Sequence, residues 1–123
     1  MNSLLVLLLI FSGVYACYAA FACCNYPALN SISSANVSQA DYNCFDVIHL
    51  TCEKKGDYVA AAFIYNYTKG ATPVNTGMEG EKVELDIECN HRTKLWRNVP
   101  GGSKLYKSYG CSFKTKNGVW VIE

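Results

Sequence analysis

Cysteine content is the feature that most constrains what this chain can fold into. Seven cysteines occur among 123 residues, and six of them follow residue 22. An even set of cysteines, in a chain too short for a large apolar interior, is typical of exported domains held together by disulfide bonds. Six cysteines can pair in 15 ways, and the sequence by itself does not choose among them. The six residues are Cys23, Cys24, Cys44, Cys52, Cys89 and Cys111.

The first 22 residues predict a cleaved signal peptide, and so a secreted, extracellular protein. No charged residue precedes Asp41, and an unbroken apolar run covers residues 4–11. Ala20-Phe21-Ala22 has the small-x-small pattern that signal peptidase recognises, although residues 14–19 offer competing sites. Cleavage after Ala22 would remove Cys17 and leave an even number of cysteines. The alternative is an uncleaved membrane anchor, against which the Ala-, Gly- and Tyr-rich second half of the segment argues.

Metal binding is the alternative use of the cysteines. Cys23 and Cys24 are adjacent, and Cys89 lies two residues before His91. No Cys-x-x-Cys occurs, whereas zinc sites favour gaps of about two to four residues. In an oxidising compartment disulfides are favoured over metal sites and catalytic thiols, so we expect no metal and no cofactor.

Composition places the chain among globular proteins. Half of the residues are hydrophobic, 17% are charged, and the formal net charge is +1. Disorder requires lower hydrophobicity and a higher net charge. A near-neutral chain also lacks the overall field that binds nucleic acid or an acidic membrane, so we expect neither as a partner. The length suits one domain, which we place at residues 23–123.

Alternating apolar residues predict β-strands. Over residues 83–89 the odd positions are apolar and the even positions acidic, which is the pattern of a half-buried strand. Ile48, Leu50 and Cys52 alternate in the same way. Residues 58–67 are apolar on both faces, which suits a central strand, although three alanines also allow a short helix.

Further short strands are expected around residues 105–113 and at 119–122, and residues 95–97 are expected to form a short strand or a turn. Asn117-Gly118 predicts a two-residue hairpin turn before the last strand. No segment has a sustained apolar stripe of helical period. About six short strands separated by turn residues predict an all-β fold, namely a small antiparallel β-sandwich of immunoglobulin size stapled by disulfides. Trp96, between Cys89 and Cys111, is expected to pack on a bridge.

Five short motifs follow one another along the chain: Cys-Phe-x-x-Ile-x-Leu-Thr-Cys (44–52), Ala-Phe-Ile-Tyr-Asn (62–66), Leu-x-Ile-x-Cys-Asn (85–90), Leu-Trp (95–96) and Tyr-Gly-Cys-Ser (109–112). Their order resembles the six-cysteine extracellular domain of nematode secreted and surface proteins, a domain of unknown molecular function. The match runs from about residue 23 to 113, most of the expected mature chain, and fits one copy of the domain. The family is thought to join its first and third cysteines, which carried over by order implies a Cys23–Cys44 bridge. For the other four cysteines we expect Cys52–Cys89 and Cys24–Cys111.

Two Asn-x-Ser/Thr sequons mark candidate glycosylation sites. Asn36-Val37-Ser38 lies in loop-like sequence, and Asn66-Tyr67-Thr68 lies at the end of an apolar strand. In a secreted chain each asparagine is a possible glycan acceptor and so a surface marker. Unused sequons are the alternative at both sites.

Charge is segregated along the second half of the chain. Residues 79–88 hold five acids and one lysine, and residues 91–117 hold seven basic residues and no acid. The basic stretch could form a patch for a sulfated glycan, a phospholipid head group or nucleic acid. The alternative is solvated strand faces on which acidic and basic strands lie opposite each other, which the near-zero net charge favours. The candidate patch consists of Arg92, Lys94, Trp96, Arg97, Lys104 and Lys107.

Catalysis has little support in the sequence. The two histidines, His49 and His91, with a lysine would be the groups of a small secreted nuclease. His49 lies in a strand pattern, and no nucleophile elbow, zinc-protease motif or phosphate-binding glycine loop occurs. We therefore predict no catalytic residues.

Two hypotheses for function follow. The first is a non-enzymatic extracellular module that binds an extracellular protein or glycan or has a structural role. The second is a small secreted effector, nuclease-like, toxin-like or antimicrobial, that acts through the basic and aromatic segment 91–116. The two differ in whether function depends on that segment.

Overall fold

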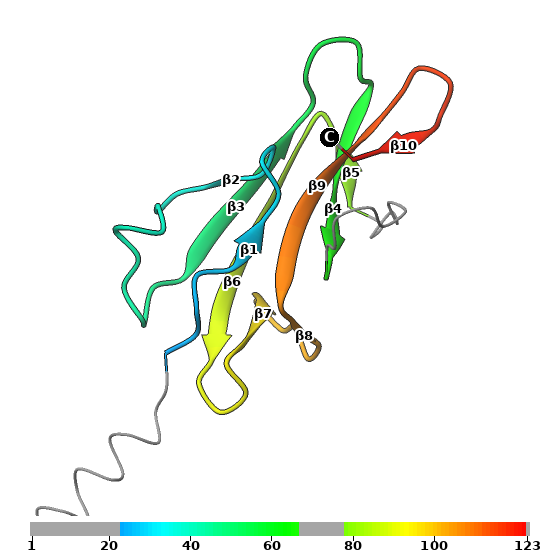
Figure 1. Cartoon of the computed structure of the whole chain (residues 1–123). Coiled ribbons are helices and arrows are strands. Elements are labelled where there is room, and N and C mark those ends of the chain that lie inside the picture. Colours follow the sequence, from blue (N-terminus) through cyan, green and yellow to red (C-terminus); the bar gives the residue numbers. More distant parts are fainter. Residues whose placement is uncertain (1–22, 67–77, 123) are drawn as a thin grey trace, which may run out of the picture.

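Two β-sheets pack face to face in the computed structural model, which describes residues 23–66 and 78–122 (Figure 1). Every regular element in these ranges is a strand, so the predicted all-β sandwich is confirmed. No helix in the described ranges is long and apolar enough to cross a membrane. The predicted signal peptide lies outside the described residues.

The first sheet has the strand order β2-β3-β6-β7-β8, and its three longest strands pair antiparallel. β7 follows β6 directly in the chain, whereas the chain passes through the second sheet between β3 and β6. Its register places Ile48 opposite Ile87 and Leu50 opposite Leu85, and these side chains point into the core. Its strands are β2 (Ser34–Ala35), β3 (Ile48–Glu53), β6 (Lys82–Asn90), β7 (Leu95–Val99) and β8 (Leu105–Tyr106).

The second sheet is organised around β9, which pairs with β4 on one side and with β1 and β10 on the other. The β1–β9 pair is parallel, and every other strand pair in the described residues is antiparallel. Residues 61–64, predicted as a central strand, are buried on both faces. The strands are β1 (Ala28–Leu29), β4 (Ala60–Tyr65), β5 (Glu79–Gly80), β9 (Ser108–Lys114) and β10 (Trp120–Val121).

Three disulfide bonds join the six cysteines that follow residue 22. Cys23 pairs with Cys44, the bridge that the family resemblance implies. The other two expected pairs are wrong, because Cys24 bonds to Cys89 and Cys52 to Cys111.

The strand register explains why Cys52 and Cys89 do not pair. Cys52 lies opposite Val83, and Cys89 lies six residues further along the same strand, roughly 20 Å away at the usual rise of a strand. Cys52 instead faces Cys111 on the other sheet, with a Cα separation of 5.6 Å. This bridge therefore joins the two sheets through the core, where both cysteines are fully buried.

The bridge between the sheets is a feature shared with immunoglobulin domains. Tyr109, two residues before Cys111, stands where those domains have a characteristic tyrosine, and its hydroxyl donates to the Asn98 side-chain oxygen at 3.2 Å. The strand order differs. β7, which lies beside β6, follows β6 in the chain, whereas strand D of an immunoglobulin domain, which lies beside strand E, precedes strand E in the chain. The domain thus has a disulfide between its two sheets, as immunoglobulin domains do, but a different strand connectivity.

Candidate functional site

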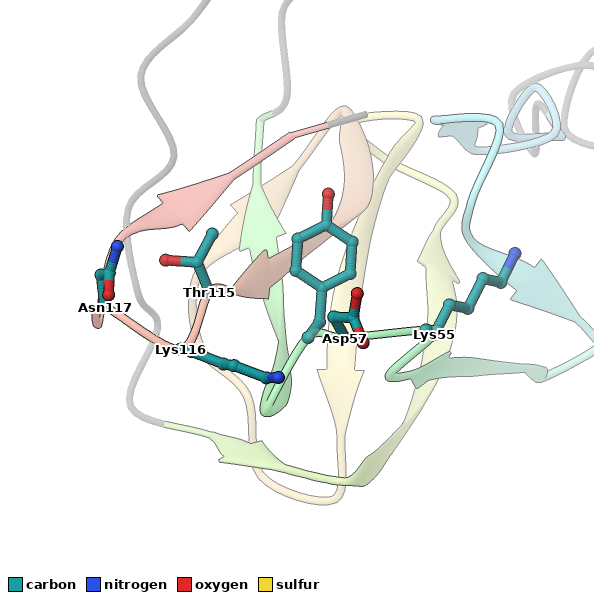
Figure 2. Close-up of a pocket in the computed structure, with 7 residues that line it drawn as sticks. Lys55, Asp57, Thr115, Lys116 and Asn117 are labelled. Atoms are coloured by element: carbon teal, nitrogen blue, oxygen red, sulfur yellow. The ribbon is translucent and has the colours of Figure 1, made fainter.

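Two loops meet at one end of the sandwich and enclose a pocket of about 590 Å³ (Figure 2). Residues 54–59 join β3 to β4, and residues 115–119 join β9 to β10. Because β4 and β9 are antiparallel neighbours, the start of β4 lies beside the end of β9. We call these two loops the loop end. The pocket is lined by Lys55, Gly56, Asp57, Tyr58, Thr115, Lys116 and Asn117.

The first loop is a hydrogen-bonded turn. The Tyr58 amide donates to the Lys55 carbonyl at 3.2 Å, and Gly56 has a φ of 52°, a conformation that favours glycine. The Tyr58 ring stacks on Phe113, with a centroid separation of 5.2 Å, and Phe113 is fully buried. The turn is therefore attached to the core.

The second loop differs from the predicted two-residue hairpin turn. The Gly118 amide donates to the Thr115 carbonyl at 2.9 Å, and the Thr115 amide donates to the Val119 carbonyl at 2.8 Å. Gly118 has a φ of 82°, whereas Asn117 is not among the described residues with positive φ. This geometry is a three-residue loop built on a type I turn with a glycine bulge. The Thr115 hydroxyl accepts a hydrogen bond from the Val119 amide at 3.2 Å, which stabilises the wider loop.

Two exposed lysines at the loop end make no salt bridge in the part of the chain that the structure describes. Within the described residues, neither Lys55 nor Lys116 makes a salt bridge, and both are exposed. The neighbouring lysines do have partners, because Lys54 lies 3.5 Å from a Glu81 oxygen and Lys114 lies 3.9 Å from a Glu79 oxygen. Figure 2 shows Lys116 extending from its loop toward the turn that holds Asp57, with Lys55 on the other side of Asp57.

The sequence did not single out Lys55 or Asp57. The signal present was Lys54-Lys55-Gly56-Asp57, a charged turn between two strands. This turn becomes part of a candidate site only because the fold places residues 115–117 beside it.

A second polar cluster lies on the outer face of the first sheet. His49 on β3 contacts two carboxylates of β6, with its Nδ1 2.6 Å from Asp86 Oδ1 and its Nε2 3.2 Å from Glu84 Oε1. The hydrogen bond to Asp86, followed by the one to Glu84, raises the pKa of His49 above 6.5. Since both ring nitrogens already bond carboxylates, neither is available to accept a proton from a substrate.

A hollow of about 500 Å³ adjoins His49 and is also lined by Asn98 and residues 99–102. No group of three or more metal-ligating side chains suited to an ion occurs in the described part of the chain. We interpret the His49 cluster as an ion-pair network between neighbouring strands.

The two histidines are not brought together. His49 lies opposite Asp86, and His91 lies five residues beyond Asp86, in the turn after β6, roughly 16 Å further along the sheet. Cys89, which with His91 formed the candidate metal pair, is bonded to Cys24 and so offers no thiolate. His91 contacts the Phe45 ring at a centroid separation of 5.2 Å.

The predicted basic and aromatic patch is divided by the fold. Trp96 is 2% exposed, because on β7 it faces inward beside its cross-strand partner Cys89 of β6, so it cannot form part of a surface patch. Its indole nitrogen donates to the Asn25 carbonyl at 3.1 Å, and its ring contacts Tyr42. Arg97 forms a salt bridge with Glu88, its cross-strand neighbour.

The remaining members of the patch are exposed on separate connections. Arg92 and Lys94 lie in the β6–β7 turn, whereas Lys104 and Lys107 flank β8. The structure thus leaves exposed cations on two connections and takes the aromatic side chain and one arginine out of the patch.

Both sequon asparagines are exposed. The Asn36 side-chain oxygen accepts from the His49 amide at 2.9 Å, and the Asn66 oxygen accepts from the Lys107 amide at 3.0 Å. The side-chain nitrogen, which carries an N-linked glycan, makes no hydrogen bond at either asparagine within the described residues. Thr68 of the second sequon lies outside the described residues.

Comparison with known proteins finds no matching family model, no similar curated protein and no similar solved structure.

Proposed function

We propose that the chain is a secreted extracellular module that binds its partner without chemical turnover, and that the loop end is its binding surface. The observation that carries this proposal is the pair of hydrogen-bonded turns that enclose the pocket beside Lys55 and Lys116. Turns that are ordered before binding lose little conformational entropy when a partner docks. Loops held by a rigid sandwich are a common place for binding residues.

Export is part of the proposal. Three disulfides form and persist in oxidising compartments, and both sequon asparagines are accessible. The Cys23–Cys44 bridge is the one implied by the resemblance to the nematode six-cysteine domain, which supports membership of that family. Mass spectrometry of material secreted by eukaryotic cells tests export, because it gives the N-terminus and the mass removed by a glycosidase.

The effector hypothesis receives less support. It requires the basic and aromatic side chains of residues 91–116 to act together, whereas Trp96 is buried and Arg97 is paired with Glu88. The loop end joins residues from both halves of the chain in one pocket and is the better candidate.

A variant that fills the pocket tests the binding surface. Asn117→Trp adds bulk at the tip of the exposed loop, where any partner seated in the pocket would collide with it. Thr93→Trp is the matched control, since it adds the same bulk in the exposed β6–β7 turn at the opposite end of the strands. Both variants should keep the melting temperature of the parent protein.

Binding is then measured on arrays of extracellular proteins and saccharides. We expect Asn117→Trp to abolish the array signals of the parent protein and Thr93→Trp to preserve them. Signals that survive Asn117→Trp but disappear in Thr93→Trp would move the binding surface to the other end of the molecule. A parent protein without any array signal would contradict the binding function itself.

A further inference from the structure

We propose, resting on the function above, that the loop end binds an acidic saccharide, whose carboxylate or sulfate groups contact Lys55 and Lys116 and whose hydroxyls contact the polar side chains between them. The inference comes from the chemistry of the side chains that line one pocket. No single residue among them would carry it.

The two lysines account for the acidic group. Both are exposed, both line the pocket, and neither has a salt-bridge partner in the described residues. Lys54 and Lys114, the lysines next to them in sequence, are paired with Glu81 and Glu79. Among the lysines of the two loops and their flanking residues, Lys55 and Lys116 are therefore the ones without a salt bridge in the described residues, and their charge attracts an anion.

The Asp57 carboxylate indicates that the same ligand also carries hydroxyl groups. Its carboxylate lies between the two lysines and would repel a simple anion such as phosphate or an acidic peptide segment (Figure 2). A carboxylate only accepts hydrogen bonds, and it therefore suits a ligand that brings donors. Sugar hydroxyls are such donors, so a ligand with both an acidic group and several hydroxyls satisfies Asp57 and the lysines together.

Two further side chains can both donate and accept hydrogen bonds, as sugar hydroxyls do. The Thr115 hydroxyl and the Asn117 amide can each donate and accept hydrogen bonds. Tyr58, which also lines the pocket, is half-buried and held by its stacking on Phe113, so it offers a fixed aromatic surface beside these groups. The set combines charge, hydroxyl partners and an aromatic ring within one pocket.

The dimensions fit an oligosaccharide. The pocket of about 590 Å³ lies within the range of roughly 300–1,000 Å³ that is usual for ligand sites. It is formed between two surface loops, which suits a chain that passes across it rather than an enclosed molecule. Both loops are fixed by backbone hydrogen bonds of 2.8–3.2 Å, so their side chains start from ordered positions.

Nuclear magnetic resonance titration of the full mature protein tests the proposal. The probes are a hyaluronan hexasaccharide, which carries carboxylates, and a chondroitin sulfate hexasaccharide, which carries carboxylates and sulfates. The comparison ligands are chitohexaose, a neutral sugar chain, and inorganic sulfate, an anion without hydroxyl donors. We expect amide shifts in residues 55–58 and 115–118 with at least one acidic hexasaccharide, and much weaker shifts with both comparison ligands.

Charge variants connect the shifts to the pocket. Lys55→Ala with Lys116→Ala should weaken hexasaccharide binding roughly tenfold or more, because two charge-assisted contacts are lost. Lys94→Ala with Lys104→Ala is the matched control, since it removes the same charge from exposed sites elsewhere, and it should leave affinity within about twofold. Asp57→Asn should strengthen the binding of inorganic sulfate relative to the parent protein, because it removes the repelling carboxylate.

The outcomes separate the two proposals. Shifts centred on residues 92–107, equal binding of chitohexaose, or no shift with either acidic hexasaccharide would overturn the acidic saccharide. If Asn117→Trp still abolishes binding of an arrayed protein in that case, the loop end remains a binding surface with a different partner. If Asn117→Trp abolishes nothing, both proposals fall.

Discussion

Single polar side chains connect segments of the chain that backbone pairing leaves apart. Asn30, which is 6% exposed, donates through its side-chain nitrogen to the Cys111 carbonyl at 2.9 Å and accepts from the Cys111 amide at 3.0 Å. The Asn30 side-chain amide lies at the edge of β9, between the β9 residues that pair with β1 and those that pair with β10. It therefore acts as a one-residue strand at the edge of the second sheet.

Asn30→Ala should lower the free energy of unfolding by about 2–4 kcal/mol, because two buried backbone groups of Cys111 lose their partners. Asn25→Ala is the control, since Asn25 is exposed and its carbonyl, which accepts from Trp96, is kept. Urea unfolding followed by tryptophan fluorescence measures both variants. Equal stability of the two variants would contradict the role given to Asn30.

His49 predicts a pH dependence. Its folded-state pKa is raised above 6.5, first by the hydrogen bond to Asp86 and then by the one to Glu84. A raised pKa means that protonated His49 stabilises the folded state, fully at pH values below the unfolded pKa near 6.5 and progressively less as pH rises through the folded pKa. Because the histidine is exposed, the effect on stability should be small.

An NMR titration of the imidazole tests whether Asp86 raises the pKa of His49 more than Glu84 does. Asp86→Asn should lower the pKa of His49 more than Glu84→Gln does, since Asp86 makes the shorter contact, 2.6 Å against 3.2 Å. The opposite order would show that Glu84 is the dominant partner.

At the scale of strands, alternation was sufficient to predict the long elements. The odd–even pattern of residues 83–89 corresponds to β6, and that of residues 48–52 to β3. The two-residue strands β1, β2 and β5 were not predicted, because two residues are too few to show a period. The strand region expected over residues 105–113 is divided into β8 and β9, which belong to different sheets. Their pairing is imposed by the longer strands beside them.

The bridges differ in what they connect. Cys52–Cys111 links β3 to β9 across the core and spans 59 residues of chain, whereas Cys23–Cys44 spans 21 residues of the segment before β3. Chain entropy alone gives these bridges about 4 and about 3 kcal/mol for separations of 59 and 21 residues. Removing the first bridge also disturbs fully buried packing.

We therefore expect Cys52→Ala with Cys111→Ala to lower the melting temperature more than Cys23→Ala with Cys44→Ala. Differential scanning calorimetry at one pH compares the two double variants with the parent. A larger loss for the Cys23 and Cys44 variant would mean that the N-terminal segment, rather than the link between sheets, limits stability.

At the scale of the whole molecule, the covalent links rival the net stability of the fold. A domain of this size has a net stability of about 5–15 kcal/mol, and each bridge contributes roughly 2–4 kcal/mol. We expect the fully reduced and alkylated protein to show no cooperative unfolding transition at or above 37 °C by circular dichroism.

Alkylation without prior reduction is the control for that experiment. It should leave the folded mature protein unmodified, because all six cysteines that follow residue 22 are paired. Alkylated cysteines in the unreduced material would contradict the bridges, and a reduced protein that still melts cooperatively would show that the apolar core alone suffices.

Charge complementarity is another property of the assembled molecule. The acidic face of β6 was expected to lie opposite basic neighbours, and Glu88 indeed pairs with Arg97 while Asp86 and Glu84 contact His49. Adjacent strands neutralise each other, and the exposed lysines at the loop end retain their charge. The proposed binding surface lies at that end of the molecule.

Local sequence determined the strand periods, the cysteine set and the class of fold, because alternation and side-chain type act over neighbouring residues. Tertiary structure alone decided which cysteines pair, that Trp96 is buried, and that Lys55 and Lys116 line one pocket. Each of these outcomes depends on strand order and register between segments far apart in the chain. A single residue of register reverses which face a side chain occupies, and no local pattern specifies that alignment.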